Sequence, residues 1–483
     1  MTNRGLLSSN LPIQTYLFSH LGLQSNVIVA ASYTSAQGTE VLSRDILYPA
    51  IRHVVQLYPE LSTVTFSRPS TTMKNRNRRW SGFLRQIDLD NHVKFVHISE
   101  KEEKTGLSAT IQRYHNIWFE DVSEKPPWQL IVVNGKHVLF VFDHYFTDGR
   151  GAAYILGGLL KALNQPSKTI VDDSPIVKVA PELPGFPEED PLIRAGLSGY
   201  FINRLIQISC RLTDSFFHDA KCQPKDKLDV INPHRETRLT KTKVDTLRLD
   251  AETVERCVKT CRKHQTSFTR LLHTLIKVIL ATDFYPKAKF SHSHLAVDIR
   301  SYLLPAPRVT MKTAVSIFTK FDWLAKFRKA GKGERDSSDK ISIVNASIVW
   351  DLAREHKSLL MEDLNHTKIW RKAWKSMELV QADDEDFIAQ AIDGYSTALR
   401  KSFEISNHGV FDPAQFGWTG SDAKWKISNM ESSASIMKAG YGTNMTFNVI
   451  GVAGVDTVIH VGSEEGSLKD NFVASVGACS NTA

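Results

Sequence analysis

Residues 136–163 constrain the fold of this chain more than any other stretch. Residues 136–142 form an almost continuous apolar run, rich in β-branched and aromatic side chains, which predicts a buried strand. The next eight residues carry two carboxylates, an imidazole and a guanidinium, from Asp143, Asp148, His144 and Arg150. Small and apolar residues follow and predict a helix that packs closely against the sheet. Because α/β proteins usually hold their sites just beyond strand ends, we expect an α/β protein with a polar site at residues 143–150.

The residues before this strand determine how it pairs. Residues 130–133 are apolar, and Asn134 and Gly135 separate them from the strand at 136–142. Asn-Gly between two apolar runs is the strongest short hairpin signal, because both residues tolerate positive φ. We therefore predict a β-hairpin over residues 130–142.

The pair His144 and Asp148 is open to two interpretations. Buried polar groups are normally hydrogen-bonded for structural reasons, so the pair could serve only the fold. The apolar neighbours Phe142, Tyr145 and Phe146 indicate instead that both ionisable groups leave bulk water together, which is typical of a functional site.

The length of 483 residues exceeds what one hydrophobic core usually holds, so we expect two domains. Prolines are scattered among acidic and basic residues from 166 to 240 and predict a crossover between two halves. We therefore divide the chain into an N-terminal subdomain at 1–165, a linker at 166–240 and a C-terminal subdomain at 241–483.

The net charge of +8 indicates an anionic partner. Nucleic acid is the alternative that we do not favour, because no basic stripe with interleaved aromatic residues accompanies the charge. The densest basic run, residues 74–80, is interpreted as a solvated loop between strands.

Composition and cysteine content favour a cytoplasmic protein without a metal. The five cysteines are odd in number and lack a framework spacing, which is typical of reduced thiols. His292 and His294 alternate along a predicted strand, but no third ligand lies near them, so a structural role is favoured over zinc. No signal peptide or membrane-spanning run is visible. Residues 196–212 are mixed apolar and basic and could touch a membrane surface, although a core or linker helix is the better interpretation.

Three short motifs resemble one family of enzymes. Residues 144–149 read His-Tyr-Phe-Thr-Asp-Gly, similar to the His-x-x-x-Asp-Gly signature of the acyltransferases with the chloramphenicol-acetyltransferase fold. Residues 298–300 read Asp-Ile-Arg and resemble the Asp-x-Arg stretch of that superfamily. Residues 406–409 read Ser-Asn-His-Gly and resemble the Ser-Asn-x-Gly turn of the fungal alcohol acetyltransferases. The chain therefore most resembles the fungal alcohol acetyltransferases, over nearly its whole length.

One further motif departs from its relatives. Residues 416–420 read Phe-Gly-Trp-Thr-Gly and partly match the Asp-Phe-Gly-Trp-Gly of plant acyltransferases. Gln415 stands where that motif has its Asp, and Thr419 is inserted.

The resemblance implies a fold and an activity. The expected fold is two chloramphenicol-acetyltransferase-like subdomains, each a mixed β-sheet flanked by helices, with a substrate tunnel between them. The expected activity moves an acetyl group from acetyl-CoA to an alcohol or a hydroxylated secondary metabolite. The expected enzyme is a cytoplasmic monomer with no permanently bound cofactor.

The resemblance also assigns roles to residues. His144 is the expected general base, since an imidazole with its ordinary pKa of about 6.5 is largely neutral at pH 7. Asp148 is expected to pair with Arg300 and hold the loop, although a role in orienting His144 is the alternative. Gly149 is expected to allow a tight backbone after the loop. Ser316, Asn407 and Trp418 are candidates for binding the oxyanion or the substrate.

Two other functions remain open at this stage. One is an acyltransferase of another kind, acting on amines or taking acyl groups from a carrier protein. Asp143 counts against the carrier-dependent kind, because peptide-condensation domains have a second His directly before the motif His. The other is a binding module of the same fold without catalysis, which the intact His144 and Asp148 disfavour.

Overall fold

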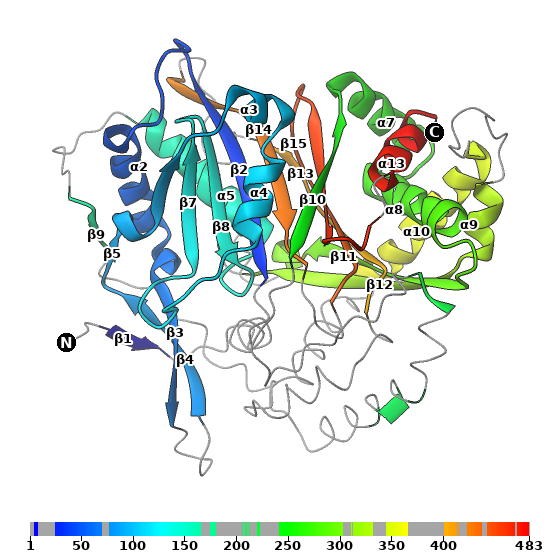
Figure 1. Ribbon diagram of the computed structural model, residues 1–483, viewed down its shortest axis with the longest axis horizontal. Helices are drawn as coiled ribbons and strands as arrows, with labels where there is room; N and C mark the ends of the chain where they lie inside the picture. Colours follow the sequence, from blue (N-terminus) through cyan, green and yellow to red (C-terminus); the bar gives the residue numbers. More distant parts are fainter. Residues whose placement is uncertain are drawn as a thin grey trace.

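Two mixed β-sheets lie side by side at the centre of the molecule, with helices outside them (Figure 1). The computed structural model describes residues 4–7, 25–69, 77–165, 174–179, 205, 208–209, 212, 220–222, 241–302, 311, 313–331, 344–365, 400–412, 414, 423–436, 442–468 and 471–482. Within these residues the predicted class, two α/β subdomains with mixed sheets, is confirmed.

The first sheet has five strands in the order β14-β2-β8-β7-β6. All neighbours are antiparallel except β6 and β7. Its strands are β14 (Trp425–Ala434), β2 (Asn26–Ser35), β8 (His137–Asp143), β7 (Trp128–Val133) and β6 (Val93–Val96). Both faces are covered by apolar contacts, one by α2 (Arg44–Leu57) and α5 (Gly149–Asn164), the other by α4 (Ser108–His115). This double burial explains why all seven residues of β8 are buried.

The predicted hairpin is confirmed. Residues of β7 and β8 pair from Trp128 with Phe142 to Val133 with His137. Asn134 and Gly135 have φ angles of 51° and 63°, as the turn requires. The motif strand is therefore fixed in register by its own turn.

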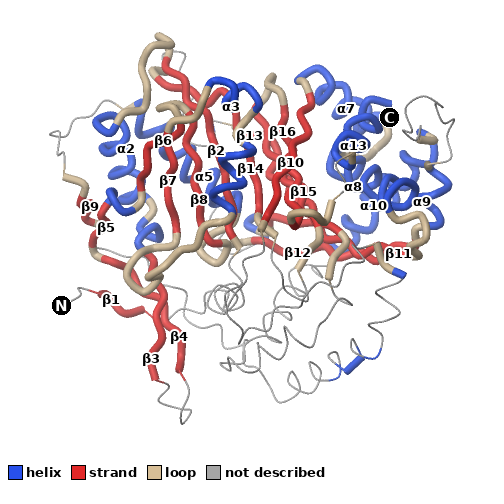
Figure 2. The backbone as a smooth tube through the Cα atoms, viewed as in Figure 1, coloured by secondary structure: helices blue, strands red, loops and turns tan. Residues whose placement is uncertain are grey.

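The second sheet has six strands in the order β10-β16-β15-β13-β11-β12. They are β10 (Thr242–Leu249), β16 (Thr457–Glu464), β15 (Met445–Val452), β13 (Phe403–Phe411), β11 (Phe290–Asp298) and β12 (Val315–Trp323). Strand β13 runs parallel to both β15 and β11, and the other pairs are antiparallel. Figure 2 shows the helices of this half gathered on its outer side. They are α7 (Ala251–Lys263), α8 (Phe268–Ile279), α9 (Ala325–Ala330), α10 (Ala346–Asn365) and α13 (Phe472–Thr482).

We predicted a loop for the basic run at residues 74–80, and this prediction is wrong for residues 77–80. Residues 77–80 begin strand β4 (Asn77–Leu84), which pairs with β3 (Thr63–Pro69) and β1 (Arg4–Leu7). Backbone pairing on both sides of β4 outweighs the polarity of its first residues. Residues 74–76 lie outside the described residues.

The three-part division of the chain stays a prediction. Within the linker, the structure describes residues 174–179 and a few others, and β9 (Ile176–Lys178) pairs with β5 (Gln86–Asp88) of the N-terminal part. Strand β14 comes from the C-terminal part but joins the first sheet beside β2. A strand from the C-terminal part of the chain thus completes the edge of the first sheet.

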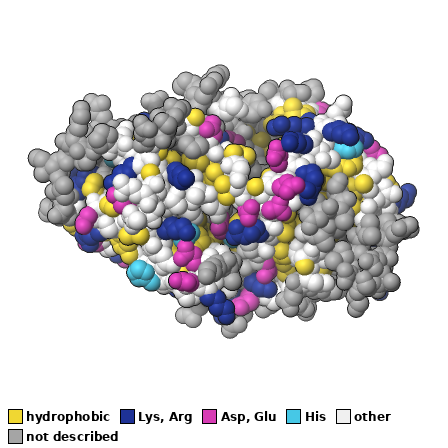
Figure 3. Space-filling model, turned by 90° about the horizontal axis from the view of Figure 1, so that it is seen from above, with side chains coloured by type: hydrophobic (Ala, Val, Ile, Leu, Met, Phe, Trp, Pro, Cys, Tyr) yellow, Lys and Arg dark blue, Asp and Glu magenta, His cyan; other side chains and the backbone are white. Residues whose placement is uncertain are grey.

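Seen from above, acidic and basic side chains are intermingled on the described surface (Figure 3).

Candidate active site

His144 follows the last residue of β8 and is anchored on one side of its ring. Its backbone N–H donates to the Ser25 carbonyl at 2.8 Å, and its Nδ1 lies 3.2 Å from the Thr147 carbonyl oxygen. A carbonyl oxygen can only accept, so this bond places the proton on Nδ1. Nε2 has no hydrogen-bond partner in the described part of the chain. The geometry therefore leaves Nε2 as the basic nitrogen.

Asp148 is held away from His144 by other groups. Arg300 Nη2 donates to both carboxylate oxygens at 2.8 and 3.0 Å, and both side chains are buried. The backbone N–H of Gly151 donates to Oδ1, and that of Ala314 donates to Oδ2, each at 2.8 Å. Asp148 thus caps helix α5 and forms the ion pair expected from the resemblance. No hydrogen bond joins it to His144 among the described contacts.

Gly149 lies close to a neighbouring side chain. Its φ lies outside the left-handed region, so backbone freedom does not explain why this residue is a glycine. A Cβ at this position would lie 2.2 Å from Cε1 of His408. The glycine therefore makes room for a second imidazole, which packs directly against the motif loop.

His408 is the site residue that sequence reasoning missed. It lines the same cavity as His144, and Arg150 Nη1 donates to its carbonyl at 2.7 Å. The pKa of His408 is lowered to about 4, mainly by burial; Asp148 opposes the shift, and Arg150 and His144 contribute to it. The signal was present in the motif Ser-Asn-His-Gly, where we had treated His408 as a variable position.

The three oxyanion candidates are placed differently. Asn407 lines the cavity, but its Nδ2 donates to Thr269 at 2.9 Å and its Oδ1 accepts from the Gly409 N–H at 2.8 Å. Ser316 is buried on β12, between Val315 and Ile317, which line the cavity. Since side chains alternate along a strand, Ser316 faces the opposite side. Trp418 lies outside the described residues.

The cavity that holds His144 lies between the two halves. Its volume is about 220 Å³, and residues from both sheets line it. Ser25, Val27 and His144 come from the first sheet and its loops, and Ala296 and Ser406 from the second. This is where the resemblance places a substrate tunnel.

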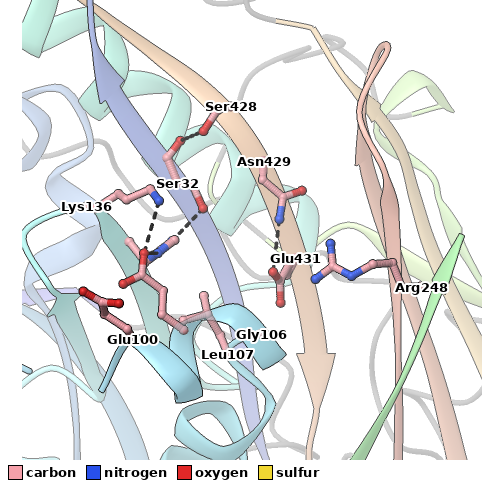
Figure 4. Close-up of a pocket in the computed structure, with 11 residues that line it drawn as sticks. Ser32, Glu100, Gly106, Leu107, Lys136, Arg248, Ser428, Asn429 and Glu431 are labelled. Carbon is pink, nitrogen blue, oxygen red and sulfur yellow. Dashed lines mark hydrogen bonds and ion pairs between the residues drawn. The ribbon is translucent and has the colours of Figure 1, made fainter. Parts of the chain in front are cut away.

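A second cavity, of about 490 Å³, opens near the start of β8 (Figure 4). Glu103 accepts there from Asn134 at 2.8 Å, and from Lys136 and His137 at 3.1 Å each. These bonds lower the pKa of Glu103 to about 2, that from Asn134 most. Figure 4 also shows Asn429 donating to Glu431, at 3.1 Å.

We searched the described residues for a cluster of metal ligands and for a helix that could span a membrane. No group of three or more His, Cys, Asp or Glu side chains is arranged to hold a metal ion there. None of the described helices combines the length and the apolar character needed to cross a bilayer.

Several solved structures share this architecture, and all are distant in sequence. The trichothecene 15-O-acetyltransferase from Fusarium sporotrichioides is 9% identical, with a TM-score of 0.62 covering 99% of this chain and 95% of that one. The condensation domain of the Monacolin K polyketide synthase is 11% identical, with a TM-score of 0.54 covering 99% and 97%. The epimerization domain of tyrocidine synthetase B is 12% identical, with a TM-score of 0.55 covering 99% and 95%.

The fold is the one shared by two-subdomain acyltransferases and condensation domains. The family model for alcohol acetyltransferases matches residues 14–454, and the chain belongs to that family. No curated protein sequence matches it. The protein is therefore an acyltransferase, and its family implies an acyl-CoA co-substrate and a small-molecule acceptor.

Proposed function

We propose that this enzyme transfers an acetyl group from acetyl-CoA to the hydroxyl group of a small hydroxylated metabolite. The observation that carries the proposal is the anchoring of His144. Its Nδ1 is bound to the Thr147 carbonyl, so its Nε2 is left as the base at the cavity between the two halves.

The proposed reaction is a direct transfer. Nε2 of His144 takes the hydroxyl proton while the oxygen attacks the thioester carbonyl, which gives a tetrahedral oxyanion. The C–S bond then breaks, the imidazolium gives its proton to the departing thiolate, and the products are an ester and coenzyme A. General base catalysis of this kind typically contributes about 10²- to 10⁴-fold in rate.

His408 supports this chemistry through its charge state. Because the pKa of His408 is about 4, its ring is neutral at physiological pH. A second cation beside His144 would repel the imidazolium that forms during transfer. The neutral ring of His408 therefore adds no such repulsion to the site.

The carrier-dependent alternative has one observation in its favour, the likeness of the fold to condensation domains. At 11 to 12% identity this likeness reports the fold alone. Asp143 stands where a condensation domain has its second histidine.

The test is to identify the product. Purified protein is mixed with acetyl-CoA and a panel of alcohols and amines, free thiol is followed by absorbance, and products are identified by mass spectrometry. We expect O-acetylated products and thiol release that depends on the alcohol. Acetylated amines alone, or turnover only with an acyl carrier protein, would contradict the proposal.

A further inference from the structure

His408 lies in the wall of the cavity that holds His144 and is fixed there from two sides. It belongs to β13 of the second sheet and is partly buried, whereas His144 follows β8 of the first sheet. Arg150 Nη1 donates to the backbone carbonyl of His408 at 2.7 Å. The ring packs so closely against Gly149 that a Cβ there would overlap it. The second sheet therefore places a fixed imidazole beside the loop that carries the proposed base.

Ser406 determines which nitrogen of this ring carries the proton. Its Oγ lies 3.4 Å from Nε2 of His408, a long hydrogen bond. The Ser406 hydroxyl has no other acceptor in the described part of the chain, so it donates to Nε2. A neutral imidazole has one N–H, which then lies on Nδ1. Because Nδ1 has no partner among the described contacts, its N–H is available to a ligand in the cavity.

The charge state of His408 suits a hydrogen-bond donor better than a base. Burial lowers its pKa to about 4, so the ring is neutral at physiological pH. A ring that takes up a proton only near pH 4 is a weak base, and it does not compete with His144 for the proton of the acceptor. The neutral ring still donates its N–H, and it brings no positive charge close to the imidazolium that forms at His144.

Two residues that the sequence suggested as oxyanion donors are less suitable. Asn407 lines the cavity, but its amide is held by Thr269 on one side and by the Gly409 N–H on the other. Ser316 alternates with two residues that line the cavity and so faces away from it. Neither residue offers what His408 does, a free N–H on a ring that lines the cavity.

We infer that His408 is a second catalytic residue, whose Nδ1–H donates to the thioester carbonyl oxygen as that oxygen becomes an oxyanion. The inference rests on the proposed function, because it takes this carbonyl to be attacked beside His144. No proton leaves His408 in this step. Negative charge grows on the oxygen as the new bond to the acceptor forms, and the carbonyl is restored when the C–S bond breaks. The first sheet thus supplies the group that moves the proton, and the second sheet supplies the group that stabilises the charge.

The test removes the donor and then restores it at one atom. His408→Phe keeps a planar ring without an N–H, His408→Asn places an amide nitrogen near the position of Nδ1, and His408→Gln places one near Nε2. We expect His408→Phe to lose about 10²- to 10³-fold in kcat, the usual loss for one oxyanion donor, with the KM for acetyl-CoA little changed. His408→Asn should recover at least about tenfold of this loss, and His408→Gln should recover little. His97→Phe, at an exposed position, is the control and should keep the wild-type kcat.

A kcat of His408→Phe within about tenfold of wild type would overturn the inference. Equal losses in His408→Phe and His408→Asn would also overturn it, because an amide does not rescue a ring that serves only packing. Rescue by His408→Gln alone would place the donor on Nε2 and contradict the assignment of Nδ1. If thermal unfolding shows that His408→Phe does not fold, His408→Ala takes its place.

Failure of the proposed function is distinguishable from failure of this inference, because the same oxyanion forms with an alcohol or an amine as acceptor. Wild-type enzyme that acetylates only amines would overturn the proposed function, and the kcat of His408→Phe with the amine would still decide the role of His408. Wild-type enzyme that acetylates alcohols, together with an unimpaired His408→Phe, would overturn this inference alone.

Discussion

Strand β8 carries a histidine at each end, and the two are held in different ways. His137, its first residue, is bonded at both nitrogens, with Nδ1 2.7 Å from Ser32 Oγ and Nε2 3.1 Å from Glu103. His144, just beyond its last residue, is bonded only at Nδ1 among the described contacts. A ring bonded at both nitrogens is fixed but has no basic atom left. A ring bonded at one nitrogen is oriented and still able to accept a proton.

The two cavities beside these histidines also differ in whether the imidazole keeps an open nitrogen. The cavity at His137 has about 490 Å³ and the cavity at His144 about 220 Å³, so size alone would not select the proposed catalytic cavity. Each contains a carboxylate that is bonded to nearby cations or amides, Glu103 in the first and Asp148 in the second. What distinguishes the proposed catalytic cavity is the open Nε2 of His144.

The largest expected effect on stability comes from Asp148, the carboxylate in the proposed catalytic cavity. Asp148 and Arg300 are both buried, so removing one charge leaves the other without its buried partner, and Arg300 then keeps only its ion pair with the more exposed Asp298 among the described contacts. Asp148→Asn and Arg300→Met should each lower the free energy of unfolding by about 3 to 5 kcal/mol. Denaturant unfolding of the single and double variants measures this.

The double variant should be no less stable than the worse single variant, because the second substitution removes a charge that has already lost its buried partner. Strictly additive losses would show that the ion pair contributes nothing. A fully stable but slow Asp148→Asn would instead favour a direct action of Asp148 on His144.

A smaller effect on stability is expected at Glu103, the carboxylate in the cavity beside His137. Glu103→Gln should lower the free energy of unfolding at pH 7 by about 1.5 to 3 kcal/mol, the range for hydrogen bonds to a charged group. The folded-state pKa of Glu103 is about 2, below its ordinary value of 4.5. Its stabilisation is therefore complete above pH 4.5 and is lost as the pH falls toward 2.

Denaturant midpoints at pH 7, 5 and 3.5 test this prediction. The difference between wild type and Glu103→Gln should be equal at pH 7 and 5 and smaller at pH 3.5. Glu120→Gln, at an exposed position, is the control and should show no difference. A difference that does not change with pH would contradict the account, and so would a large loss of activity in Glu103→Gln.

The smallest expected effect concerns the contact between Gly149 and His408. Gly149→Ala should lower the free energy of unfolding by about 1 to 3 kcal/mol, because the new methyl group overlaps the imidazole ring. Adding His408→Ala should restore part of this loss by removing the ring. Thermal unfolding of the three variants measures it. Full stability of Gly149→Ala would show that the ring moves away at no cost.

Local patterns in the sequence predicted the elements that carry the site. The apolar run, the Asn134-Gly135 turn and the small residues of α5 were sufficient for strand, hairpin and helix, because each depends on neighbours in the chain. The resemblance supplied the pairing of Asp148 with Arg300, which lie 152 positions apart.

Contacts that depend on folded geometry were not predictable. Nothing in the local sequence indicates that His408 lies against Gly149, or that the Thr147 carbonyl sets the tautomer of His144. The pairing of β4 was missed because its polar first residues are typical of a loop. The exchange of β14 into the first sheet likewise depends on packing between distant segments.

The most direct test of the central claim compares kcat in His144→Ala and His137→Ala with acetyl-CoA and an accepted alcohol. The account predicts that His144→Ala loses about 10²- to 10⁴-fold in kcat at an unchanged melting temperature. His137→Ala should keep kcat within a few-fold but melt at a lower temperature, because its two hydrogen bonds are structural. Retention of more than about a tenth of kcat in His144→Ala, well short of the loss for a general base, would contradict the claim.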